Sequence, residues 1–121
     1  MSYSSEYHDP EKIGSNIVGG RIVLALESSI THENCSEIEE RIEDVIQQNK
    51  TEIILDFKHV DFLDSAALEI LVQTHTELIS RGGALKIIGL NEICRDILLA
   101  TRIINLFFVY KDMHEAITHN P

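Results

Sequence analysis

The sequence has few basic residues, few cysteines and no long apolar run. Only 10 of its 121 residues are Lys or Arg, against 20 Asp or Glu, which gives a net charge of −10 with neutral histidines. Because phosphate backbones attract basic surfaces, we do not expect a nucleic acid as direct partner. No apolar run approaches the roughly 20 residues that a membrane-spanning helix needs. Residues 1–16 contain no apolar signal-peptide core, so we expect a cytoplasmic protein.

Patterns typical of metal sites and enzymes are also missing from the sequence. The two cysteines, Cys35 and Cys94, are far apart and form neither a CxxC pair nor a zinc-type pattern with histidine. Both fall on apolar positions of predicted helices, so we expect buried thiols. There is no Gly-rich phosphate loop, no HExxH motif and no supported Ser-His-Asp order. We therefore expect no enzymatic activity, no metal and no cofactor.

The whole sequence is 44% hydrophobic and 25% charged, and this composition and length are typical of one folded domain. We expect a flexible N-terminal tail over residues 1–15 and a domain over residues 16–119. Alternating strands and helices imply parallel βαβ units, so we predict an α/β domain with a mixed sheet of four to five strands and about four helices. His75 shares the apolar stripe of the second helix, where a packed or edge histidine is the usual case.

The predicted elements follow from apolar spacing and from capping residues. They are a hairpin over 17–26 that turns at Gly19 and Gly20, a helix from an N-cap at Thr31 to Gln48, a central strand at 52–57, a helix at 65–81 that stops at Gly82 and Gly83, a strand at 84–88, a short helix capped by Asn91, a strand at 106–110 and a helix at 112–119.

The segment between the central strand and the second helix contains Asp61, Asp64 and Ser65. Serine is a strong N-cap residue, because its hydroxyl accepts a hydrogen bond from a free backbone N–H of the first turn. Asp64 would add a favourable negative charge at the positive end of the helix dipole. The residues alone favour this capping role for Ser65, with a functional role as the alternative.

The stretch from Val60 to Leu71, V-D-F-L-D-S-A-A-L-E-I-L, resembles the signature of the STAS domain. The resemblance is strongest to the bacterial anti-sigma factor antagonists, which typically read V-x-F-M-D-S-S-G-L-x-x-L. I-I-L-D-F around Asp56, R-G-G-A-L at 81–85 and the stretch 98–116 extend it to about residues 17–117. This implies a STAS-like fold with its helices mainly on one face of the sheet.

In that family, the serine that matches Ser65 is phosphorylated by a partner that is both an anti-sigma factor and a GHKL-type serine kinase. A PP2C-type phosphatase removes the phosphate. The resemblance implies that the unphosphorylated chain binds the anti-sigma factor and frees a sigma factor, and that phosphorylation ends this binding. It also implies a docking surface around Ser65, made of Asp61, Phe62, Leu63, Asp64, Ala66, Ala67 and Glu69.

The sequence departs from the family pattern beside Ser65. Ala66 and Ala67 stand where the family usually has a serine and a glycine, which leaves Ser65 as the acceptor and raises helix propensity by up to about 1 kcal/mol. Because of these two alanines, partner choice can differ. Residues 27–31 replace the family's E-L-D sequence before the first helix, so the family's partner contacts from that loop are not carried over to this chain. The alternative function is a STAS phosphoswitch that regulates a secretion, biofilm or lipid-transport assembly. We expect a monomer or a weak dimer.

Overall fold

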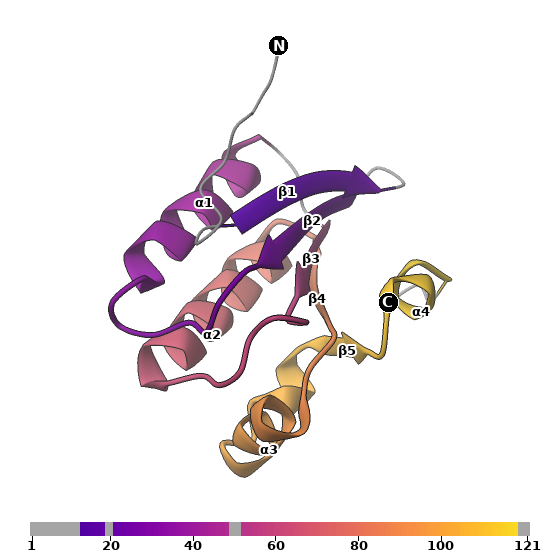
Figure 1. The fold of residues 1–121 in the computed structure, drawn as a ribbon. Helices are drawn as coiled ribbons and strands as arrows, with labels where there is room; N and C mark the ends of the chain where they lie inside the picture. Colours follow the sequence, from indigo (N-terminus) through magenta and orange to yellow (C-terminus); the bar gives the residue numbers. More distant parts are fainter. Residues whose placement is uncertain (1–12, 19–20, 49–51, 119–121) are drawn as a thin grey trace.

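The computed structural model of the chain describes residues 13–18, 21–48 and 52–118, and the side chains from residue 21 on. Five strands form one mixed sheet in the order β1-β2-β3-β4-β5, in which β1 is antiparallel to β2 and the other neighbours are parallel (Figure 1). The strands are β1 (Ile13–Val18), β2 (Arg21–Leu26), β3 (Glu52–Asp56), β4 (Ala84–Ile88) and β5 (Phe108–Tyr110). The helices are α1 (Cys35–Gln47), α2 (Ser65–Ser80), α3 (Glu92–Ala100) and α4 (Met113–Thr118), with a short 3-10 helix η1 (Ile104–Leu106). The predicted α/β domain with a mixed sheet is confirmed.

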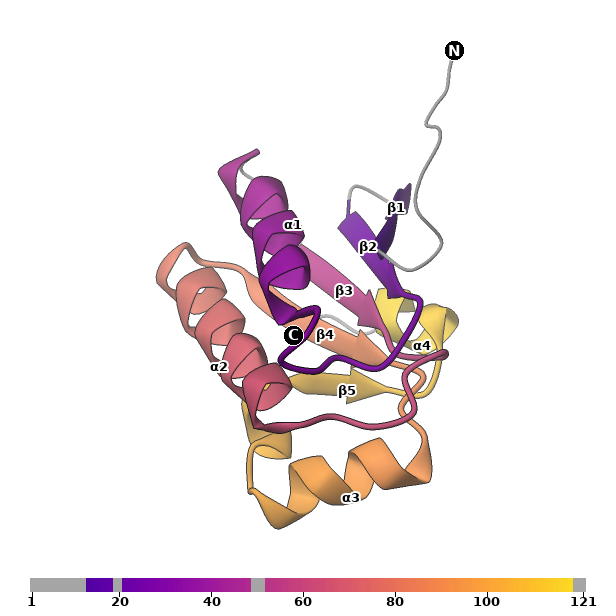
Figure 2. The ribbon, with the colours of Figure 1, turned by 60° about the vertical axis from the view of Figure 1, so that its left-hand side comes forward.

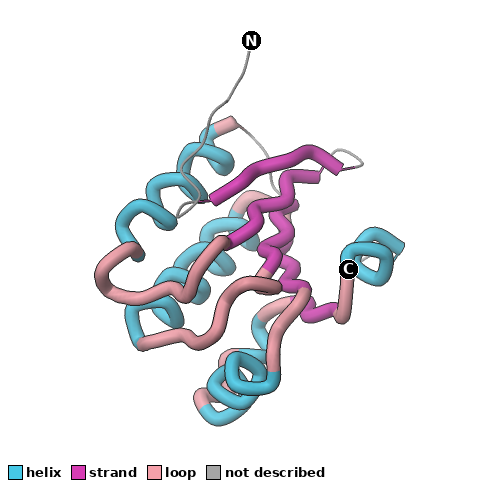
Figure 3. Tube along the Cα trace, viewed as in Figure 1, coloured by secondary structure: helices cyan, strands magenta, loops and turns pink. Residues whose placement is uncertain are grey.

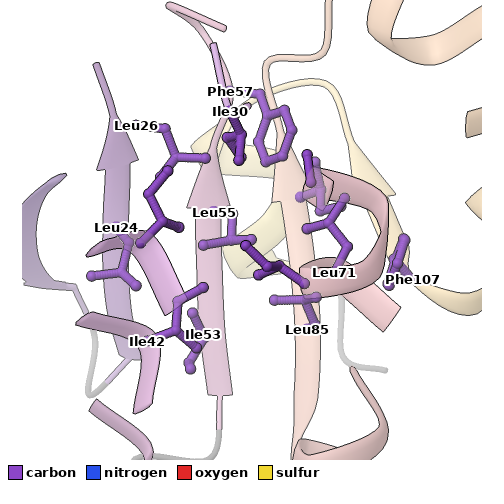
Figure 4. Close-up of a cluster of buried hydrophobic side chains, with 14 of the residues drawn as sticks. Leu24, Leu26, Ile30, Ile42, Ile53, Leu55, Phe57, Leu71, Leu85 and Phe107 are labelled. Atoms are coloured by element: carbon purple, nitrogen blue, oxygen red, sulfur yellow. The ribbon is translucent and has the colours of Figure 1, made fainter. Parts of the chain in front are cut away.

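Alternation along the strands divides the core between the two faces of the sheet. Leu24, Leu55 and Ile87 are register partners on neighbouring strands and belong to the large cluster covered by α1, α2 and α3. This cluster fills the space between sheet and helices (Figure 4). Their chain neighbours Val23 and Ile54 belong to a second, smaller cluster with α4. Three helices therefore cover one face and α4 covers the other, as Figure 2 shows.

The face of the sheet that α4 covers contains a buried charge that the sequence does not indicate. Lys86 on β4 is 0% exposed, and its Nζ lies 2.8 Å from Oε2 of Glu52. The same ammonium donates a hydrogen bond of 2.7 Å to the carbonyl of Ala116 in α4 and lies 5.6 Å from the centre of the Tyr110 ring. Arg21 contacts the same Glu52 oxygen at 2.7 Å. A charged network thus ties α4 to the sheet.

The predicted ends of several elements are wrong for local reasons. The predicted N-cap of the first helix is Thr31, but the helix begins at Cys35, with Asn34 at the N-cap position. The hydroxyl and carbonyl of Thr31 instead accept hydrogen bonds from backbone N–H groups of a turn that precedes the helix. The last strand is shortened to Phe108–Tyr110 because residues 104–106 form a 3-10 helix. β1 begins at Ile13, whereas the predicted hairpin begins at residue 17; the sequence does not indicate residues 13–16 because a run of Gly, Ser and Asn interrupts the apolar alternation. Residues 1–12 and the predicted turn at 19–20 lie outside the described residues.

The two thiols differ in their surroundings. Cys94 is fully buried, and burial together with the charge of Asp61 raises the pKa of its thiol. Cys35 is only partly buried, because it lies at the first turn of α1, and its Sγ lies 3.6 Å from the carbonyl of His32. The prediction that both thiols are buried is therefore confirmed for Cys94 and wrong for Cys35. His75 packs edge-on against Phe107, with 5.6 Å between ring centres.

Gly89→Ala should destabilise the fold by about 2–3 kcal/mol, because Gly89 has φ +76° and an added Cβ would lie 3.1 Å from the backbone nitrogen of Lys58. Gly82→Ala is the matched control, since Gly82 has φ +79° with open space around it and should lose only about 1 kcal/mol. Urea unfolding of the two variants measures the difference. Equal losses of unfolding free energy would show that contact with the Lys58 backbone does not destabilise Gly89→Ala.

Candidate functional site

The candidate site lies at the carboxyl end of the parallel strands. We call residues 57–64, which join β3 to α2, the Ser65 loop. Because β3 lies between β2 and β4, the Ser65 loop runs between the β2–α1 loop and the β4–α3 loop, as the loops in Figure 3 show. A parallel bridge between Ile30 and Leu63 joins the first two of these loops. In open α/β sheets this edge is the usual place for binding sites.

Asp64, rather than Ser65, caps α2. Its Oδ1 accepts a hydrogen bond of 3.1 Å from the N–H of Ala67, and its Oδ2 accepts one of 2.9 Å from the N–H of His32. Ser65 is the first residue of the helix and is exposed. The prediction that Ser65 caps the helix is therefore wrong. Aspartate caps as well as serine does, and its second oxygen also reaches the β2–α1 loop.

The same hydrogen bonds keep Asp64 charged. Burial opposes its ionisation, but the N–H groups of Ala67 and His32 outweigh burial and lower the pKa of Asp64 below its ordinary value of 3.8. Nδ1 of His32 lies 3.7 Å from the same carboxylate. A negative charge therefore stands beside Ser65 at neutral pH, at the positive end of α2.

Two further side chains hold the backbone of the Ser65 loop. Oγ of Ser29 accepts hydrogen bonds from the N–H groups of Asp61 and Phe62, at 3.1 and 3.2 Å. Asn91 caps α3 through Oδ1, which accepts from Cys94 at 2.7 Å, and its Nδ2 lies 3.2 Å from the carbonyls of both Val60 and Asp61. The sequence indicated Asn91 as a cap and gave no sign of its second role or of the role of Ser29.

The seven residues of the expected docking surface differ in exposure. Asp61, Phe62 and Glu69 are exposed, as is Ser65, and Asp64 and Ala66 are partly buried. Leu63 and Ala67 are only 5% and 0% exposed and belong to the large core cluster. They anchor the loop and the start of α2 in the core but present almost no surface to a partner. Phe62, at 46% exposed, is the large apolar side chain of this surface.

An acidic groove of about 720 Å³ lies along one side of the Ser65 loop. Its walls come from the β2–α1 loop, the start of α1 and the Ser65 loop, and the residues are Glu27, Ser28, Ser29, Thr31, Glu33, Asn34, Glu37, His59 and Asp61. Within the described ranges, no three His, Cys, Asp or Glu side chains come together as metal ligands would. A search of the described helices also finds none with the length and apolar character needed to cross a membrane.

Asp64→Ala should lower the melting temperature by a few degrees, because it removes the acceptor for two backbone N–H groups. Ser65→Ala should leave it within about one degree, because the Ser65 hydroxyl caps nothing in the described part of the chain. Thermal unfolding followed by circular dichroism compares the two. A larger loss for Ser65→Ala than for Asp64→Ala would contradict this assignment of the cap.

Several solved structures share this fold. A candidate anti-sigma factor antagonist of Thermotoga maritima aligns with a TM-score of 0.84 and 22% identity, over 87% of this chain and 91% of its own. An anti-sigma factor antagonist from Mycobacterium paratuberculosis has a TM-score of 0.78 and 22% identity, over 93% and 97% of the two chains. Phosphorylated SpoIIAA, a cell fate determinant of Bacillus, has a TM-score of 0.68 and 20% identity, over 87% and 96%.

At these identities the solved structures establish the fold alone. A search of curated proteins finds no significant match. The family itself comes from the sequence, because a family model for the STAS domain matches residues 12–116. That match includes β2 to β5, the Ser65 loop and α2. The chain therefore belongs to the STAS domain family.

Proposed function

We propose that this chain is an anti-sigma factor antagonist switched by phosphorylation of Ser65. Its unphosphorylated form binds an anti-sigma factor that is also a GHKL-type serine kinase, and this binding frees a sigma factor. Phosphorylation ends the binding, and a PP2C-type phosphatase restores it. The chain acts in the cytoplasm, by binding rather than by catalysis. Structural likeness to antagonists, including a phosphorylated one, supports this proposal.

The position of the Ser65 hydroxyl carries the proposal. It is exposed at the first residue of a 16-residue helix, and the neighbouring Asp64 already takes the N-cap position. The hydroxyl is therefore available to a kinase without breaking a capping bond. A phosphate placed there would lie at the positive dipole end of α2, so the free domain can accommodate it.

The same phosphate would oppose binding in a complex. It adds a charge of about −1.5 to −2 beside Asp64, on a docking surface that also contains the exposed Asp61. In an interface these charges lose water and repel one another. The phosphate need weaken association by only about 1.4 kcal/mol to reduce affinity tenfold. The exposed docking surface consists of Asp61, Phe62, Ser65 and Glu69, with Asp64 and Ala66 at its edge.

The test is to incubate the protein with ATP and each GHKL-type kinase encoded in the same genome, followed by mass spectrometry. We expect one kinase to add a single phosphate, and peptide mapping to place it on Ser65. Ser65→Ala should abolish the modification. Ser36→Ala is the matched control, because Ser36 is an exposed serine in the first turn of α1 and should not change it.

Modification of Ser36 or another residue would contradict the assignment of Ser65. Phosphorylation of Ser65 that leaves binding of the same kinase unchanged would contradict the switch. Release of a sigma factor from its complex with the kinase, on addition of the unphosphorylated protein, tests the final step. If no sigma factor is released although binding and phosphorylation occur, the transcriptional output is wrong.

A further inference from the structure

We infer that Ser29 and Asn91 are positioning residues that hold the Ser65 loop in the shape that the kinase binds. The inference rests on the proposed function, and it adds two residues from outside the Ser65 loop and α2 to the candidate site. Neither residue is next to Ser65 in the chain, and they come from the two loops that flank the Ser65 loop at the edge of the sheet.

Ser29 holds one side of the loop through its backbone donors. One oxygen accepts from two successive N–H groups, those of Asp61 and Phe62. Two successive N–H groups that converge on one acceptor fix the two peptide planes on either side of the Asp61 Cα. The second plane lies immediately before Phe62, whose side chain is 46% exposed and has the largest apolar surface of the proposed docking residues. Ser29 therefore fixes the backbone from which the Phe62 side chain projects.

Asn91 holds the other side through two backbone acceptors. Its Nδ2 lies 3.2 Å from the carbonyls of Val60 and Asp61, while its Oδ1 caps α3. The Asp61 residue is thus fixed from both sides, with its N–H bound to Ser29 and its carbonyl bound to Asn91. A chain segment with four backbone groups held by side chains from outside loses much of its freedom before any partner arrives.

This arrangement affects recognition because ordering a loop during binding costs free energy. A loop that is already ordered in the free protein does not incur that cost in the complex. Loss of either side chain frees polar backbone groups that can bind water, so the fold survives while the loop becomes looser. The expected signature is weaker recognition by the kinase with almost unchanged global stability.

The chain offers substitutions that separate holding the loop from other roles. Ser29→Ala removes the acceptor, and Ser28→Ala makes the same change at the neighbouring, partly buried serine that also lines the groove. Asn91→Ser keeps a side chain able to cap α3 but is too short to donate to Val60 and Asp61. Asp112→Ala is the control for loss of a cap elsewhere, since Asp112 accepts from Glu115 at the start of α4.

The first measurement needs no partner. Amide hydrogen exchange of the free protein, followed by NMR, should show that Ser29→Ala raises the exchange rates of Asp61 and Phe62 about tenfold or more. Asn91→Ser should raise them by about threefold, while Ser28→Ala and Asp112→Ala leave them as in the wild type. Wild-type exchange rates in Ser29→Ala and Asn91→Ser would overturn the inference.

The second measurement uses the kinase that phosphorylates Ser65 in the wild type. Ser29→Ala and Asn91→Ser should each reduce kcat/KM for phosphorylation about tenfold, mainly through a higher KM, with melting temperatures within a few degrees of the wild type. Ser28→Ala and Asp112→Ala should retain the wild-type value. Equal kcat/KM values for all four variants would show that phosphorylation does not depend on the hydrogen bonds of Ser29 and Asn91 to the Ser65 loop. If no kinase modifies Ser65, the proposed function fails, and the exchange rates alone decide whether these side chains order the loop.

Discussion

Ser65→Asp should weaken binding to the partner kinase by at least about tenfold, whereas Ser65→Ala should bind as tightly as the unphosphorylated wild type. The aspartate places a second carboxylate next to Asp64, which the N–H groups of Ala67 and His32 keep ionised. In the interface the two charges repel each other and lose water. Alanine removes the phosphorylation site without adding charge, so it should bind constitutively. Isothermal titration with the purified kinase measures both affinities.

Ser36→Asp is the matched control for this prediction. Ser36 is exposed in the first turn of α1, so the substitution adds the same charge to a helix start outside the proposed docking surface. It should change affinity by less than about twofold. An equal loss for Ser36→Asp and Ser65→Asp would assign the effect to net charge. Equal binding by Ser65→Ala and Ser65→Asp would contradict the local electrostatic switch.

Lys86→Ala should destabilise the domain by about 3 kcal/mol, the largest effect we expect from a substitution remote from Ser65. The substitution removes the fully buried partner of Glu52, frees the carbonyl of Ala116 and opens a cavity under α4. Lys86→Met retains most of the volume and should lose less. Lys58→Ala, at an exposed lysine, should stay within about 0.5 kcal/mol. Urea unfolding measures all three, and a loss for Lys86→Ala as small as that for Lys58→Ala would contradict the role of the network.

Glu52 makes the same network sensitive to acid. Burial opposes its ionisation, but hydrogen bonds from Lys86 and Arg21 outweigh burial and lower the pKa of Glu52 below its ordinary value of 4.5. The stabilisation from this carboxylate is therefore complete above pH 4.5 and is lost as the pH falls through the lowered pKa. Glu52→Gln should be less stable than the wild type at pH 7 and should lose less stability on acidification.

Thermal unfolding between about pH 7 and pH 3 tests the acid response of Glu52. Glu39→Gln, at an exposed position of α1, is the control and should follow the wild-type profile. If Glu52→Gln keeps the full acid sensitivity of the wild type, other carboxylates account for it.

The order and type of the elements could be predicted because each strand and helix buries its own apolar pattern. The run from Ile53 to Leu55 is apolar on both faces and lies in the middle strand of the sheet, and Asn91 begins α3. Lys86 could not be assigned in this way. Its charge suggests an exposed strand position, and its burial depends on contacts with Glu52 and with the carbonyl of Ala116, which are more than 29 positions away in the chain.

The candidate site was predictable as a segment but not as a set of contacts. Asp64 and Ser65 are both good caps, and the sequence does not show that a second oxygen of Asp64 meets the backbone of His32. For the same reason Ser29 gave no signal, because its two bonds join loops more than 30 positions apart. Such contacts depend on the strand order, which places these loops side by side.

The most direct test of the switch at Ser65 compares two forms of one protein. The kinase and ATP convert the wild type to the form phosphorylated on Ser65, and isothermal titration then measures the affinity of each form for the kinase. We predict that the unphosphorylated protein binds at least about tenfold more tightly and that the difference shrinks as salt is raised. Equal affinities for the two forms, with the phosphate confirmed on Ser65, would contradict the central claim.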